Sequence, residues 1–193
     1  VVVRFAQQVR ADLSRFAADH PGVHASAGIS LIGGKYPLYQ AARAAGGAES
    51  AAKDLPGKDA VTFLEATLPW SRFGTGREAV GPESQTVSGM QAYLRSLIEE
   101  QGAPESVLRV LLQLYADYNK ALKEQQQRGE DRTQTGEEQV PWGAWMWRGY
   151  YRLKHHKRKD SPVSRLADRL HEDHFRTISW LGIAARWAEL AMR

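Results

Sequence analysis

Two hydrophobic periods alternate along residues 1–64. A helix is predicted first, because apolar side chains recur at helical spacing, at Phe5, Val9, Leu13 and Phe16. Between residues 23 and 31 the period falls to two, which is typical of a strand with one apolar face and one small polar face. The polar positions are His24, Ser26, Gly28 and Ser30. This polar face is a candidate to lie beneath a ligand, although an antiparallel sheet that is solvated on one face gives the same pattern.

A second helix and a second strand are predicted downstream. Pro37 fits the first turn of a helix, where its missing N–H has no intrahelical partner. The apolar stripe of that helix would be Leu38, Ala42, Ala45, Ala48 and Ala52. Pro56 and Gly57 then turn the chain into a strand over residues 60–64. Two helices and two strands bury too little apolar surface to be stable alone. We therefore expect a C-terminal piece of something larger, or a sheet completed by another polypeptide.

The pattern becomes entirely helical after residue 64. Residues 67–83 are rich in Gly, Pro and Ser and are expected to form a linker. About five helical segments with short connections then follow, which is typical of a small bundle. One helix is predicted over residues 142–159, and Ser161 and Pro162 are predicted to be the N-cap and first position of the next. We predict an α+β chain with a helix–strand–helix–strand unit over residues 1–66 and an all-α bundle over residues 84–193.

Composition excludes several classes of protein. The 193 residues contain no cysteine, so disulfide and thiol chemistry are excluded. No apolar run approaches the ~20 residues that a membrane-spanning helix needs, and polar residues interrupt the first ten positions, so they do not form a signal peptide. The expected compartment is the cytoplasm, with no membrane partner. A net charge of +4 does not by itself indicate nucleic acid.

Basic residues gather in the second half of the chain. Between residues 142 and 170, Lys and Arg outnumber Asp and Glu by eight to two. Such a run can neutralise phosphates and make RNA binding dependent on salt, although a solvated face gives the same pattern. The candidate RNA-binding residues are Arg148, Arg152, Lys154, Lys157, Arg158 and Lys159.

Aromatic residues lie beside this basic run, at Trp142, Trp145, Trp147, Tyr150 and Tyr151. They can stack on bases, but we favour a role in the core of the bundle. The segment His171-Glu172-Asp173-His174 invites a metal site, yet its histidines are three residues apart and no third ligand is identified, so we favour an exposed helix end. We assign no catalytic and no metal-binding residue.

Four short segments carry a resemblance to a known family. They are Ser26-Ala27-Gly28-Ile29, Lys35-Tyr36-Pro37-Leu38-Tyr39, Ala52-Lys53 and the segment GKDAVTFL over residues 57–64. In order and spacing they resemble the second palm domain of the Csm-type large subunit of type III-A CRISPR effector complexes. The resemblance implies an incomplete ferredoxin-like palm, followed by the helical domain that ends that subunit.

The resemblance also implies a function. Members of the family join ATP molecules into cyclic oligoadenylates, using divalent metal ions (Mg or Mn) held by a GGDD hairpin. No GGDD occurs in this sequence, so ATP and metal would be bound mainly by residues outside it. The nucleotide-binding residues carried over to matching positions are Ser26, Lys35, Lys53 and Lys58.

The implied partners are the remaining part of the large subunit, the other subunits of the complex, including the small and stem-type subunits, and the guide and target RNA. Two alternatives stay open. The chain could be a purely structural and RNA-binding part with an inactive palm, or it could be a fragment of a GGDEF-type nucleotide cyclase, which shares the palm fold. The fragment alone is expected to be inactive.

Overall fold

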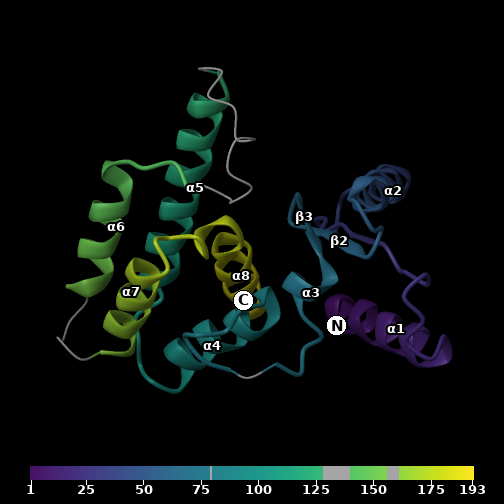
Figure 1. The fold of residues 1–193 in the computed structure, drawn as a ribbon, viewed down its shortest axis with the longest axis horizontal. Helices are drawn as coiled ribbons and strands as arrows, with labels where there is room; N and C mark the ends of the chain where they lie inside the picture. Colours follow the sequence, from purple (N-terminus) through teal and green to yellow (C-terminus); the bar gives the residue numbers. More distant parts are fainter. Residues whose placement is uncertain (79, 128–139, 156–160) are drawn as a thin grey trace. The chain divides into compact units, whose positions relative to one another are not determined.

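The computed structural model describes residues 1–78, 80–127, 140–155 and 161–193 (Figure 1). They form two compact units, Val1–Glu78 and Ala79–Arg193. The first unit contains both helices and strands, and the described part of the second is helical, so the predicted α+β class is confirmed.

The first unit is a three-stranded sheet with helices packed on it. Its elements are α1 (Val2–Phe16), β1 (Ala27–Ile29), α2 (Leu38–Asp54), β2 (Ala60–Phe63), β3 (Ala66–Pro69) and α3 (Trp70–Phe73). The strand order is β1-β2-β3, with β1 parallel to β2 and β3 antiparallel to it. Because α2 connects two parallel neighbours, β1–α2–β2 is a crossover unit.

Helix α2 lies directly over β1, and Gly28 makes this approach possible. A Cβ atom at Gly28 would lie 2.5 Å from the carbonyl oxygen of Ala45 and 2.8 Å from the carbonyl carbon of Ala48. Both atoms belong to the α2 backbone, which cannot move aside locally. The expectation that the polar face of this strand lies beneath a ligand is therefore wrong at Gly28, because a helix covers it.

The apolar stripe predicted for the first helix faces outward. Val3 and Gln7 are the buried positions of α1, and Gln7 Nε2 donates a hydrogen bond to the carbonyl oxygen of Gly74 at 2.9 Å. Phe5 and Phe16 are exposed instead, Phe16 by 91%. The periodicity predicted the helix correctly, but a different face packs on the sheet.

Strand β3 lies where the linker was expected. The chain reverses between Phe63 and Ala66 through Leu64 and Glu65, which both have positive φ, at 50° and 64°. Two residues in the left-handed conformation match the twist of a tight hairpin, but the sequence of such a turn is usually Asn-Gly or Asp-Gly. The expected linker over residues 67–83 is thus corrected: β3 and α3 occupy its first part, and the first unit ends at Glu78.

The second unit is a five-helix bundle in its described part. Its helices are α4 (Val87–Glu99), α5 (Ser106–Gln127), α6 (Ala144–Lys154), α7 (Pro162–Glu172) and α8 (Ile178–Ala191). Figure 1 shows α8 against α4 and α5, and α6 beside α5 and α7. Helix α8 supplies eight buried residues, from Ile178 to Ala188, and packs against both α4 and α5, so it lies at the centre of the core.

The predicted start of α7 is confirmed. The Ser161 hydroxyl accepts a hydrogen bond from the Ser164 N–H at 3.1 Å, and Pro162 occupies the first helical position. The helix predicted to run to residue 159 is described only as far as Lys154, and residues 156–160 lie outside the described part. No helix among the described residues is long and apolar enough to cross a membrane.

Candidate functional site

Two of the predicted nucleotide-binding residues meet at one end of the sheet. The Ser26 hydroxyl, just before β1, donates a hydrogen bond to the Lys58 carbonyl oxygen at 2.6 Å. Lys58 lies in the turn before β2, with a φ of 54°, and its side chain is exposed. Because β1 and β2 are parallel, both residues lie at the N-terminal edge of the pair.

The other two lysines lie at opposite ends of α2. Lys53 belongs to the last turn and pairs with Glu49, its Nζ lying 2.7 Å from the carboxylate oxygen, and both side chains are largely exposed. Lys35 precedes the first residue of the helix, Leu38. An α-helix rises about 1.5 Å per residue, so Leu38 and Lys53 are about 22 Å apart along the axis. The structure therefore gathers Ser26, Lys53 and Lys58 near one edge and separates Lys35 from them.

A second cluster at this edge was not found from the sequence. Arg10 of α1 binds Asp59 with two hydrogen bonds, Nη2 to Oδ2 at 2.7 Å and Nε to Oδ1 at 3.2 Å. Its guanidinium lies 5.8 Å from the ring centroid of Trp70, whose Nε1 donates to the Ala25 carbonyl oxygen at 2.8 Å. These contacts tie α1, β1 and β2 together where Ser26 and the lysines gather. No local pattern predicts them, because Arg10 and Asp59 are 49 positions apart.

Arg10 and Asp59 are expected to be thermodynamically coupled by about 1 kcal/mol, since their contact is bidentate but partly exposed. A double-mutant cycle with Arg10→Ala and Asp59→Asn, measured by urea unfolding, checks this value. The coupling should fall as salt is added, because salt screens partly exposed charges. Additive single effects at low salt would contradict the expectation.

The predicted RNA-binding cations divide into three groups. Lys154 is held by Asp168 of α7, with its Nζ 2.6 Å from each carboxylate oxygen, and the Tyr150 hydroxyl donates to the same carboxylate at 3.2 Å. This ion pair joins α6 to α7, so Lys154 has a structural role in the bundle. Lys157, Arg158 and Lys159 lie outside the described residues. The third group consists of Arg148 and Arg152, which both lie on α6.

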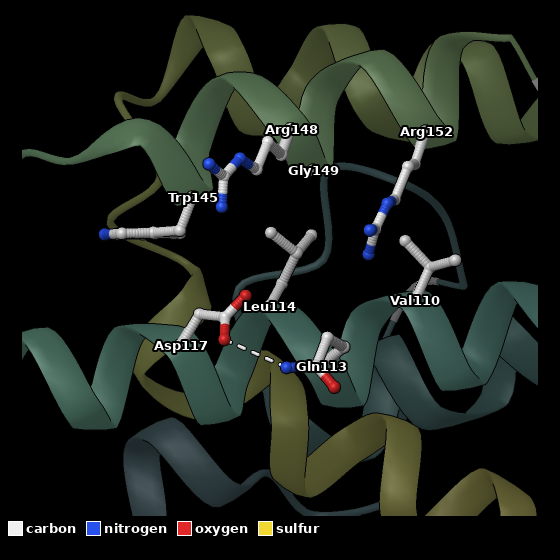
Figure 2. A pocket seen from close by; sticks show the side chains of 8 residues that line it. All are labelled: Val110, Gln113, Leu114, Asp117, Trp145, Arg148, Gly149 and Arg152. Carbon is white, nitrogen blue, oxygen red and sulfur yellow. Dashed lines mark hydrogen bonds between the residues drawn. The ribbon is translucent and has the colours of Figure 1, made fainter.

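Arg148 and Arg152 line a pocket between α5 and α6. Its volume is about 330 Å³. Figure 2 shows both guanidinium groups reaching from α6 toward α5, where Asp117 and Gln113 form the opposite wall. Gln113 Nε2 donates to Asp117 Oδ1 at 2.9 Å. Gly149 lies between the two arginines and packs against Leu114, and the absence of its side chain lets the helices approach closely.

The aromatic residues beside the basic run lie in different environments. Trp145 is 8% exposed and stands in the core between Tyr118 and Phe175, at ring distances of 6.1 Å and 5.7 Å. Trp142, Trp147 and Tyr151 are 81%, 58% and 63% exposed. Assigning the aromatic residues to the core is therefore right for Trp145 and wrong for these three. The signal in the sequence is the repeated pair Trp147-Arg148 and Tyr151-Arg152, four residues apart.

The His-Glu-Asp-His segment ends α7. His171 is exposed and lies beside the rings of Trp147 and Tyr150, at 6.2 Å and 5.1 Å between ring centroids. Asp173 accepts a hydrogen bond from the Thr177 N–H at 3.1 Å just before α8 begins. Within the ranges that the structure describes, no three His, Cys, Asp or Glu side chains gather in a way that could hold a metal ion.

Comparison with known proteins bears on the first unit. No curated protein and no solved structure matches the chain. One family model, described as Cas10/Cmr2, second palm domain, matches residues 1–62, about a third of the chain. The matched range contains α1, β1, α2 and most of β2, and with them Ser26 and the three lysines. Residues 1–62 are therefore similar to the second palm domain of the Cas10/Cmr2 family.

Proposed function

We propose that this chain is part of the large subunit of a type III-A (Csm-type) CRISPR effector complex, where it completes the palm that binds ATP and makes cyclic oligoadenylates when target RNA binds. The similarity of residues 1–62 to the Cas10/Cmr2 second palm domain carries the proposal. In this role the chain works in antiviral defence, and its partners are the rest of the large subunit, the other subunits, the guide RNA and the target RNA.

The described residues suit the substrate side of such a palm. Phosphoryl transfer depends mostly on positioning and on cations that neutralise phosphate charge. Lys58 makes no ion pair with any residue that the structure describes, and the exposed pair of Lys53 with Glu49 is weak enough to be exchanged for a phosphate. The metal ions would be held mainly by residues outside this chain, because the GGDD hairpin that holds them in the resembled family is absent from this sequence. When bound there, the metal would supply charge neutralisation at the phosphates.

Exposed groups on the first unit also support the proposal that another polypeptide packs against it. Strand β1 is an edge of the described sheet, and it presents unpaired backbone groups on one side. Phe5, Val9 and Phe16 of α1 are exposed, as are Leu31 and Ile32 after β1. Exposed apolar side chains that share one face of a helix, as Phe5, Val9 and Phe16 do, are typical of an interaction surface. We propose that the remaining part of the large subunit covers them.

In the whole complex, Lys53→Ala combined with Lys58→Ala is expected to lower oligoadenylate synthesis roughly hundred- to ten-thousandfold, because two contacts are lost and hydrogen bonds to charged groups contribute about 1.5–3 kcal/mol each. Target RNA binding should be retained. The measurement is the rate of oligoadenylate formation from ATP at saturating target RNA.

Lys120→Ala is the matched control. Like Lys53, Lys120 is an exposed helical lysine that forms an ion pair with a glutamate one turn away, in this case Glu124. Lys35→Ala tests the separation along α2 and should have a smaller effect than the double variant. Unchanged synthesis in the Lys53/Lys58 variant would refute the nucleotide site and favour the purely structural and RNA-binding role.

A further inference from the structure

The exposed side of α6 presents two aromatic rings in one row. Trp147 and Tyr151 are one turn apart, and both are more than half exposed. Side chains four positions apart on a helix are neighbours, so the two rings lie on the same face of α6. His171 lies beside Trp147, and His155 stacks on Tyr151 with ring centroids 4.0 Å apart. These contacts restrict both rings without covering them.

Two arginines form the adjacent row. Arg148 and Arg152 are also one turn apart, and Arg148 is three residues before Tyr151, a spacing that makes their side chains neighbours on the helix surface. Neither makes an ion pair with a residue in the described ranges, in contrast to Lys154. A rise of about 1.5 Å per residue places the two arginines about 6 Å apart along α6, a spacing that suits successive phosphates of an extended strand. Both side chains reach into the pocket between α5 and α6 (Figure 2).

We propose that this face of α6 binds single-stranded RNA, with bases stacked on Trp147 and Tyr151 and phosphates held by Arg148 and Arg152. Aromatic rings interleaved with cations are the arrangement that binds unpaired nucleotides without sequence preference. The choice of RNA rests on the proposed function, whereas the stacking platform rests on the geometry of α6. The carboxylate of Asp117 repels phosphates from the α5 wall and favours their binding on the α6 side.

A single strand fits this surface better than the alternatives. In an RNA duplex the base faces are stacked on one another, so exposed rings have nothing to bind. An acidic peptide would use the arginines but would leave Trp147 and Tyr151 without a function. The repeat of ring and cation at four-residue spacing matches a ligand that alternates flat bases with anionic groups.

The test measures binding of the full 193-residue chain to a fluorescein-labelled 12-nucleotide oligoadenylate by anisotropy at several salt concentrations. Trp147→Leu and Tyr151→Leu are each expected to weaken binding roughly tenfold, because each removes one stacking ring. Trp147→Phe should keep most of the affinity. Arg148→Ala with Arg152→Ala should reduce the slope of log affinity against log salt by about 1.4, the value for two phosphates of a single strand.

Trp142→Ala and Arg109→Ala are the matched controls, because both side chains are exposed and neither lies on this face of α6. Both should bind as the native chain does. Circular dichroism checks that every variant is folded, and Tyr151→Leu provides the test if Trp147→Leu is not folded.

Several outcomes would overturn the proposal. They are equal or tighter binding of a 12-base-pair RNA duplex, equal competition by polyglutamate, tighter binding of the matching DNA strand, and a Trp147→Leu variant that binds normally. These outcomes do not depend on oligoadenylate synthesis in the complex. The proposed function and the stacking surface can therefore fail separately.

Discussion

Replacing Gly28 with valine is expected to destabilise the N-terminal unit by about 3 kcal/mol or more, because overpacking a tightly packed site forces the backbone to shift. The new side chain would meet the α2 backbone at Ala45 and Ala48. Displacing α2 would also move Lys53 away from Ser26 and Lys58. Urea unfolding combined with hydrogen exchange of peptides from β2 gives the measurement, since β2 is buried throughout.

Gly46→Ala supplies a control of opposite sign in the contacting helix. A Cβ at Gly46 would meet nothing within 4 Å, and alanine favours a helix interior over glycine by about 0.5–1 kcal/mol. This variant should therefore stabilise the unit slightly. A Gly28→Val protein with an unchanged unfolding midpoint would contradict the close contact of β1 with α2.

Replacing Trp145 with alanine is expected to destabilise the bundle by about 3–5 kcal/mol, whereas Trp147→Ala should change its stability by less than about 0.5 kcal/mol. The two tryptophans are two positions apart on one helix. Trp145 fills the space between Tyr118 and Phe175, while Trp147 is mostly exposed. Denaturant unfolding followed by far-ultraviolet circular dichroism compares the variants. Equal losses would show that Trp147 also belongs to the core and would weaken its assignment to an RNA surface.

This contrast also separates stability from binding. Trp145→Ala should lose RNA binding only as the fold is lost. Trp147→Ala should lose RNA binding while the unfolding transition stays in place. Comparing the two readouts for the same pair of variants therefore shows whether a ring acts through the core or at the surface.

Periodicity was sufficient to predict most of the elements. The order helix–strand–helix–strand, the cap at Ser161 and the five helices of the bundle all follow from local patterns that the structure confirms. Strand β3 was not predicted, because the turn before it is formed by Leu64 and Glu65 at positive φ, and neither residue type favours that conformation by itself. The surrounding sheet pairing holds the turn in place, and such support is not visible in a local window.

The residues of the candidate sites show a similar division. The sequence by itself determined which residues are candidates for the sites: Ser26 and the lysines by their resemblance to a palm, and Arg148 and Arg152 by the excess of positive charge. Only the tertiary structure decided which of these candidates lie close together. It brings Ser26 to Lys58, places Lys35 at the far end of α2, and commits Lys154 to Asp168. The physical reason is that the spacing of residues along a helix or strand determines which side chains lie on the same face of that element. The residues that pack against this face come from distant segments of the chain, and no local pattern encodes that packing.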